Sequence, residues 1–164
     1  MIPGQQNGSL NRQTQTAMHR QVAEDHGFTA IADVDILDAD GSMELPVEGG
    51  TRLEENLIGA HFGNYDSYIV LSHFKGHAMA GFGGAIKNIS IGLSSKEGKC
   101  LIHTAGASNS SPWGGDQTGF MESMAEGSET LKNRGESRDG LHTLEHAEEI
   151  GLGTRTYELV SLDE

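Results

Sequence analysis

Three histidines lie near a glycine-rich segment in the middle of the chain, and their side chains can bind a metal ion or exchange protons. His73 ends the apolar stretch YIVLSH, and His77 follows it four residues later. His103 ends KCLIH. Neutral imidazole is the commonest transition-metal ligand and also titrates near neutral pH. We interpret His73, His77 and His103 as candidate metal ligands and His77 also as a candidate acid or base. Structural histidines held by hydrogen bonds are the alternative.

The glycines between these histidines indicate a binding site for an oxyanion. Gly81, Gly83 and Gly84 fall in GFGGAIK, where we expect a loop without regular structure that enters a helix near Ala85. Glycine lets successive backbone N–H groups approach an anion closely, and a helix N-terminus favours negative charge. The spacing matches neither the P-loop nor the dinucleotide-binding fingerprint, so the pattern predicts phosphate binding without naming a known motif.

Lysines gather in the same region of an otherwise acidic chain. Between Ser67 and Gly115 there are four lysines and one acidic residue, a local charge of +3, while the whole chain carries −13. Such an island guides an anion to one place. A solvated lysine face is the alternative. We expect a small anionic ligand or cofactor as partner, bound by Lys75, Gly81, Gly83, Gly84, Lys87 and Asn88, with Lys87 also a catalytic candidate.

Composition excludes several classes of protein. A formal charge of −13 and a pI near 4.9 argue against nucleic acid or an anionic membrane as partner. No apolar run approaches the ~20 residues of a membrane span, and the N-terminus is polar, so we expect a cytoplasmic protein. Cys100 is the only cysteine, which argues against a disulfide or a four-thiolate iron–sulfur cluster.

Residues 1–11 are rich in Gln, Asn and Gly, and we expect them to be disordered. Hydrophobic periodicity predicts a single α/β domain over 12–164. Alternating helices and strands favour a mixed or partly parallel sheet with flanking helices, whose carboxyl edge would collect the histidines. A metal-binding pair, His142 and His146, is the weaker interpretation of the last helix, which we expect to be a solvated one. We expect helices over 14–26, 120–132 and 142–153, strands over 28–37, 43–47, 68–73, 99–103 and 156–162, and an exposed loop over 106–117.

The string LSHFKGHAMAGFGGAIKNISIGLSSKEGKCLIHTAG resembles the signature of the domain-of-unknown-function 362 family, whose members are often described as uncharacterised iron–sulfur centre proteins. The resemblance continues through HGFTAIADVDILDADG and ESRDGLHTLEHAEEIGLGTRTYELVSLD. It implies a chain about twice this length, with a cysteine-containing stretch between Met124 and Glu136 and, in many members, a ferredoxin-like cysteine cluster. Neither is present, so we expect a truncated or internally deleted relative.

The order His77, GFGG, Lys87, IGLSS, His103 is also similar to a segment of the nickel-pincer lactate racemase family. This resemblance implies that His77 exchanges a substrate proton, that Lys87 tethers the pyridinium-derived nucleotide and that His103 ligates nickel. The racemase uses a second catalytic histidine and a second domain, and neither has a match in this chain.

Our leading hypothesis is therefore a protein that binds a divalent transition metal, nickel or iron, or a phosphate-bearing metal–nucleotide cofactor at His77, Lys87 and His103. Proton-transfer chemistry is an extension of it. An iron–sulfur or electron-transfer protein and a non-catalytic folded remnant are the two alternatives, and a homo-oligomer is compatible with each.

Overall fold

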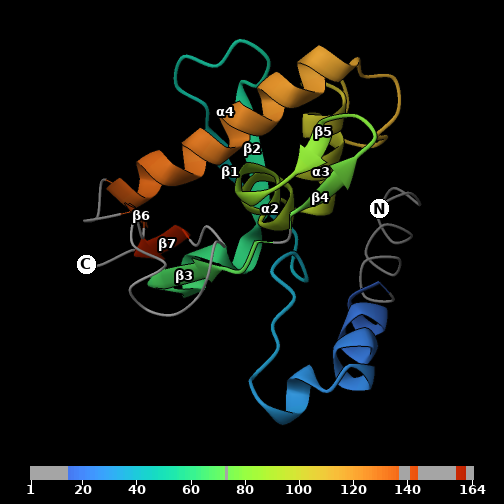
Figure 1. The fold of residues 1–164 in the computed structure, drawn as a ribbon, viewed down its shortest axis with the longest axis vertical. Coiled ribbons are helices and arrows are strands. Elements are labelled where there is room, and N and C mark those ends of the chain that lie inside the picture. Colours follow the sequence, from blue (N-terminus) through green and yellow to red (C-terminus); the bar gives the residue numbers. More distant parts are fainter. Residues whose placement is uncertain (1–14, 73, 137–140, 144–157, 162–164) are drawn as a thin grey trace, which may run out of the picture.

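The computed structural model describes residues 15–72, 74–136, 141–143 and 158–161, and it has an α/β fold (Figure 1). The α/β class predicted from the sequence is confirmed. In chain order the elements are a helix over residues 15–25, η1 (Phe28–Ala30), β1 (Ser42–Pro46), β2 (Glu55–Gly59), η2 (Ala60–Asn64), β3 (Ser67–Val70), β4 (Lys75–His77), β5 (Gly81–Gly83), α2 (Ala85–Gly92), α3 (Lys96–His103), α4 (Gln117–Glu136), β6 (Leu141–Thr143) and β7 (Glu158–Ser161).

The strands that the structure describes form three small sheets rather than one. β1 pairs with β2, β4 with β5, and β7 lies between β3 and β6. Every pairing in the described part of the chain is antiparallel, so the expectation of a partly parallel sheet is wrong. The reason is local: β1 and β2, like β4 and β5, are joined by short connections, whereas parallel pairing needs a long crossover.

Helices α2, α3 and α4 pack beside these sheets and enclose the core (Figure 1). Two apolar clusters of described residues fill it. One gathers residues from both strands of the first sheet, from η2 and from helices α2 and α4: Leu45, Ile58, Phe62, Ile89 and Leu131. The other lies between α3 and the first half of α4: Leu53, Ile102, Phe120 and Met124.

Helix α3 replaces the strand that we expected over 99–103. Ser95 caps its start by accepting a hydrogen bond from the N–H of Gly98 at 3.1 Å. Gly98 then permits close contact with β2, because a Cβ there would lie 1.9 Å from the carbonyl oxygen of Leu57. The five residues of KCLIH are too few for hydrophobic periodicity to distinguish a strand from a helix. The Ser95 cap and the packing of Gly98 favour the helix.

The strand expected over 28–37 is also wrong. Phe28–Ala30 is a 3-10 turn, and the residues up to Ile36 have no regular structure. Ile31 is 81% exposed, so its apolar side chain contributes nothing to the core that a strand would require. The segment is held instead by its carboxylates, since Asp35 accepts hydrogen bonds from His61 and Tyr65.

Two expectations around the glycine-rich segment need correction. Strand β3 ends at Val70 rather than at residue 73, and the apolar side chains of Ile69 and Leu71 are exposed. Regular structure does form before Ala85, because β4 and β5 make a hairpin through the glycines. Helix α2 begins at Ala85 as predicted.

Most of the remaining expectations about helices, strands and loops are confirmed. The structure confirms the first helix, the strand at 43–47, the exposed loop over 106–117, the helix that contains 120–132 and a strand within 156–162. Residues 141–143 form β6 rather than the start of a helix, and His146 lies outside the described residues, as does the segment 1–11. Among the helices that the structure describes, none has the length and apolarity needed to cross a membrane.

Candidate functional site

His77 ends strand β4, and the turn after it fixes the orientation and tautomer of its ring. The backbone N–H groups of Met79 and Ala80 both approach Nδ1, at 3.3 and 3.1 Å, so Nδ1 accepts hydrogen bonds. Gly81, with φ +73°, completes the turn in the left-handed region that favours glycine. The proton of the neutral ring is therefore on Nε2, which makes His77 a hydrogen-bond donor at that atom.

His103 lies in the last turn of α3 and has the opposite tautomer. Its Nδ1 lies 2.6 Å from the carbonyl oxygen of Lys99, one turn earlier, and donates a hydrogen bond to it. In the neutral ring Nε2 then carries no proton, so it can accept a hydrogen bond or ligate a metal.

Phe120 brings the two imidazoles together. This residue is fully buried in the first turn of α4, and both histidine rings stack on it. Its ring centroid is 5.8 Å from that of His77 and 4.7 Å from that of His103, with interplanar angles of 24° and 29°. Two imidazoles that are 26 residues apart in sequence thus contact the same aromatic side chain, one with a hydrogen-bond donor at Nε2 and the other with an acceptor there. Sequence reasoning missed Phe120, because nothing local distinguishes it from any core aromatic.

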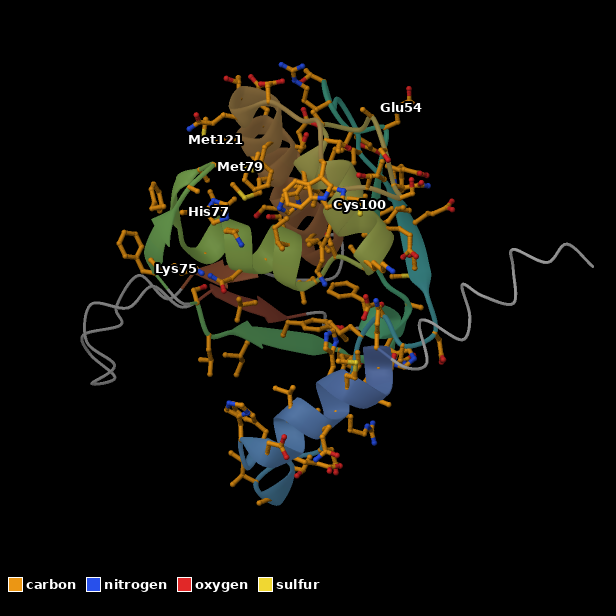
Figure 2. The ribbon with its side chains drawn as sticks, turned by 90° about the vertical axis from the view of Figure 1, so that its right-hand side faces the viewer. Glu54, Lys75, His77, Met79, Cys100 and Met121 are labelled. Carbon is orange, nitrogen blue, oxygen red and sulfur yellow. The ribbon has the colours of Figure 1, made fainter. Side chains whose placement is uncertain are left out.

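The β4–β5 hairpin leaves open the face that carries Lys75 and His77. Residues two apart in a strand share a face. Their partners across the hairpin are Gly83 and Gly81, so β5 adds no side chain there. Lys87, from the first turns of α2, uses this space: a Cβ on Gly83 would lie 3.0 Å from its Cδ. Figure 2 shows Lys75 and His77 where the hairpin meets α2.

The electrostatics of this group favour an anion. Burial lowers the pKa of Lys87, and the charge of Lys75 lowers it further. The pKa of His77 is also lowered, first by burial and then by the positive charges of Lys87, Lys75 and His103. The positive charges in this group therefore disfavour the protonated forms of His77 and Lys87. A bound anion would relieve that repulsion, since an opposite charge favours the protonated forms.

The other predicted residues have defined places around this group. Gly84 precedes α2 and makes no side-chain cap, so the first N–H groups of the helix lack that partner. A Cβ on Gly84 would lie 3.7 Å from Phe74 and Phe82, an ordinary contact, so this position has room that Gly83 lacks. Asn88 is turned inward, and its amide donates to the carbonyl oxygen of Gly84 at 2.7 Å.

A three-histidine metal site has only two of its members in the described residues. His73 lies outside them, while His77 and His103 share Phe120. Where the structure describes side chains, no group of three His, Cys, Asp or Glu is arranged to hold a metal ion. Cys100 is buried in α3, and burial raises the pKa of its thiol.

A second titratable cluster was not anticipated from the sequence. His61 donates from Nδ1 to Asp35 at 2.8 Å and from Nε2 to Asp40 at 2.9 Å, and Tyr65 donates to Asp35 at 2.7 Å. Hydrogen bonds to Asp40 and then to Asp35 raise the pKa of His61. The only sequence signal was the group of aspartates after Ala32. Their distance in space to His61 does not follow from the sequence.

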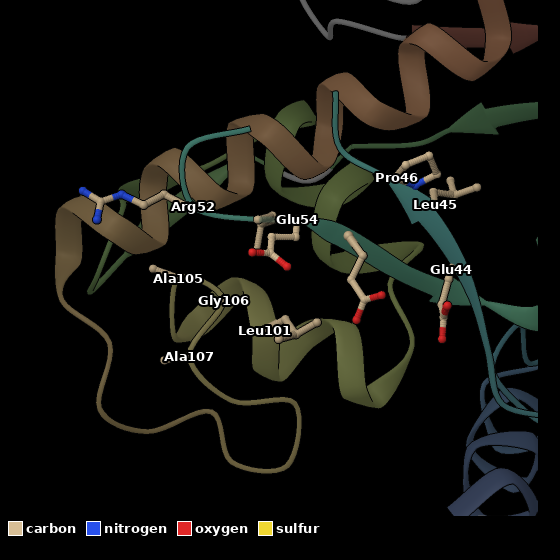
Figure 3. Close-up of a pocket in the computed structure, with 11 residues that line it drawn as sticks. Glu44, Leu45, Pro46, Arg52, Glu54, Leu101, Ala105, Gly106 and Ala107 are labelled. Carbon is tan, nitrogen blue, oxygen red and sulfur yellow. The ribbon is translucent and has the colours of Figure 1, made fainter. Parts of the chain in front are cut away.

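The cavity in Figure 3 lies elsewhere, between β1, β2 and the end of α3, with a volume of about 910 Å³. Three carboxylates line it, from Glu44, Glu54 and Glu55, with Leu101 on the opposite side. Arg52 also lines it, and its Nε lies 2.6 Å from Glu122. None of the residues predicted to bind a cofactor lines this cavity.

Comparison with known proteins places the chain in a family. The family model described as Domain of unknown function (DUF362) matches residues 4–155, so the chain belongs to that family. No significant match was found among curated proteins or among solved structures.

Proposed function

We propose that this family member binds an anionic, phosphate-bearing metal–nucleotide cofactor at His77, Lys87 and His103. The observation that carries the proposal is the convergence of three side chains from a hairpin and two helices. His77 and His103 stack on the same ring of Phe120. Lys87 lies against Gly83 beside them and its charge acts on His77.

Each side chain has a distinct role in this proposal. Lys87 is partly desolvated, so its ammonium group gains by pairing with a phosphate and its amine form is a nucleophile for a covalent tether. The bare Nε2 of His103 is a single metal-ligating atom, which suits a metal whose remaining ligands come from the cofactor. Nickel and iron both accept imidazole, and either would supply Lewis-acid chemistry when bound.

His77 is the proton-transfer group of the proposal. Its Nε2 carries the proton, and two backbone N–H groups keep the ring in that tautomer. A lowered pKa keeps the imidazole neutral near pH 7, and in the tautomer that the turn selects, Nε2–H donates a hydrogen bond. To take a substrate proton at Nε2, the ring must instead carry its proton on Nδ1, which breaks the two hydrogen bonds from the turn. Racemisation needs a second group on the opposite face of a substrate. His61, already bonded to Asp35 and Asp40, does not offer one.

Phosphate would lie at the start of α2. Gly83 and Gly84 present backbone there without side chains, and the helix N-terminus adds a favourable dipole. Lys75, exposed on the same hairpin face as His77, adds a second positive charge. The iron–sulfur alternative has less support, because the one cysteine of the chain is buried in α3.

A calorimetric titration with inorganic phosphate and with a mononucleotide tests the proposal. Lys87→Met should weaken binding about tenfold or more, since a charge-assisted hydrogen bond contributes roughly 1.5–3 kcal/mol. Lys96→Met is the matched control, because Lys96 is an exposed lysine at the start of a neighbouring helix. Equal affinities for the two variants would remove Lys87 from the site.

The glycines provide a second, sterically defined test. Gly83→Ala should displace Lys87, because the added methyl would lie 3.0 Å from its Cδ, and binding should weaken in step with Lys87→Met. Gly92→Ala is the control, since Gly92 is the last residue of α2 and a methyl there meets nothing within 4 Å. Circular dichroism establishes that both variants fold. If Gly92→Ala weakened binding as much as Gly83→Ala, the effect would lie in helix α2 and not in Lys87.

A further inference from the structure

The loop that joins α3 to α4, residues 104–116, starts directly after His103 and ends four residues before Phe120. Both of its ends are fixed. Gly115 packs against the last turn of α3, because a Cβ there would lie 2.0 Å from the carbonyl oxygen of His103. Asp116 caps α4 by accepting a hydrogen bond from a backbone N–H of its first turn at 2.9 Å. The loop is therefore held beside the two residues whose rings stack in the candidate site.

Trp113 stands out in this loop by its exposure. It is the only tryptophan of the chain and is 83% exposed, more than any other large apolar residue that the structure describes. Tryptophan is highly buried on average in folded proteins, so this side chain is kept outside the core. Trp113 precedes Gly115 by two residues, so their Cα atoms lie within roughly 7 Å of each other. The indole is thus presented to solvent beside the backbone of His103.

The composition of the loop indicates which part of a nucleotide it would contact. Residues 104–115 contain no charged side chain, whereas Lys75 and Lys87 supply the positive charge around His77. The loop therefore offers no charge to a phosphate group. An unpaired nucleobase is recognised by an aromatic plane that stacks on its face and by polar groups that bond to its edges. Four hydroxyl or amide side chains precede Trp113: Ser108, Asn109, Ser110 and Ser111.

We propose that Trp113 stacks on the base of the nucleotide that this site binds. The inference rests on the proposed function, and it assigns the two ends of the ligand to different elements. The phosphate end pairs with Lys87 at the start of α2, and the base end lies against the loop that leaves His103. Stacking on an aromatic side chain tolerates any base. Trp113 therefore favours a nucleotide over a sugar phosphate without selecting one base.

The test compares adenosine monophosphate with ribose 5-phosphate, which has the same sugar and phosphate but no base. Calorimetric titration of the parent chain should give a lower Kd for adenosine monophosphate by roughly five- to 150-fold, the usual contribution of one stacked base. Since Trp113 is the only tryptophan, its fluorescence reports the contact without a label. Adenosine monophosphate should quench this fluorescence, and ribose 5-phosphate should leave it unchanged.

Three variants assign the effect to the indole. Trp113→Ala should bind ribose 5-phosphate as the parent chain does and should lose the preference for adenosine monophosphate. Trp113→Phe should keep part of that preference, because a phenyl ring still stacks on a base. Phe28→Ala is the control and should keep all of it, since Phe28 is an exposed aromatic residue in η1, which lies far from α3 and α4 in Figure 1. Both positions are exposed, so none of the substitutions removes a core contact.

Two results would overturn the stacking alone. The parent chain would bind ribose 5-phosphate as tightly as adenosine monophosphate, or Trp113→Ala would keep the whole preference. A failure of the proposed function gives a different pattern, in which neither compound binds or Lys87→Met binds both as tightly as the parent chain does. That pattern would overturn the stacking together with the site on which it rests.

Discussion

Glu126 in α4 holds a segment that has no regular structure of its own, and its removal gives a quantitative prediction. One carboxylate oxygen accepts from the N–H of Thr51 at 2.8 Å and from its hydroxyl at 2.7 Å. The other accepts from the N–H of Leu53 at 2.9 Å, and the N–H of Arg52 lies between the two oxygens, 3.2 and 3.1 Å from them. Leu53 packs in the same apolar cluster as Phe120, on which both histidines stack. Glu126 therefore helps to hold the residues that support the candidate site.

Glu126→Gln preserves shape but replaces one accepting oxygen with an NH₂ group that faces a backbone N–H. Hydrogen bonds to a charged group contribute roughly 1.5–3 kcal/mol, so we expect a loss of about 2 kcal/mol in the free energy of unfolding. Glu122→Gln is the control one turn earlier, because it removes only an ion pair with Arg52, and solvent screening makes such exposed pairs weak. Urea unfolding of the three proteins at pH 7 measures both losses.

The same pair of variants gives a pH dependence of known sign. Burial raises the pKa of Glu126, but the hydrogen bonds from Thr51, Leu53 and Arg52 outweigh it and leave the pKa below 4.5. A lowered carboxyl pKa stabilises the fold above the unfolded value and loses that contribution as pH falls through the folded value. The difference between the parent chain and Glu126→Gln should therefore shrink below about pH 4.5. A loss at pH 7 no larger than that of Glu122→Gln would refute the reasoning.

Three further predictions concern other parts of the chain. His61 has a raised pKa, so its imidazolium stabilises the fold below about pH 6.5 and this contribution disappears as pH rises through the folded value. His61→Gln should flatten that part of the stability–pH curve. An unchanged slope in urea midpoints counts against a stabilising contact of His61 with Asp35 and Asp40. Lys87 has a lowered pKa and should react with an acylating reagent near neutral pH ahead of Lys96. Added phosphate should protect Lys87 from the reagent. If peptide mapping finds equal labelling rates for the two lysines with and without phosphate, Lys87 is an ordinary surface lysine. Gly98→Ala should cost about 2–3 kcal/mol, because its Cβ would lie 1.9 Å from a β2 carbonyl oxygen, and a urea midpoint near that of the parent chain would contradict this packing.

The assignment of His77, Lys87 and His103 to one site stays a prediction, and the elements expected to position them were wrong. In the structure both histidines stack on Phe120 and Lys87 lies against Gly83. The expected reason was the common edge of a parallel sheet. The actual arrangement uses a glycine hairpin, the first turns of α2 and the last turn of α3.

The wrong predictions have a common physical cause. Whether a short apolar segment forms a strand, a helix or neither depends on contacts with residues distant in sequence. KCLIH is helical because Ser95 caps it and Gly98 fits against β2. FTAIADVDIL is not a strand, because Asp35 is held by His61, 26 residues away. By contrast, the long helix α4 and the helix start at Ala85 depend on local signals and were predicted correctly.

The central claim, that His77, Lys87 and His103 form one cofactor site, is tested most directly on protein purified from a native-like host. Intact-mass measurement under native conditions, with metal analysis of the same sample, reports a bound or covalently attached group and its metal together. We predict a mass increment and a metal in the parent chain, both reduced in Lys87→Met and in His103→Ala. Both should be retained in the control His26→Ala, whose exposed ring follows the helix over residues 15–25. Equal increments and equal metal content in all four proteins, or none in any of them, would contradict the claim.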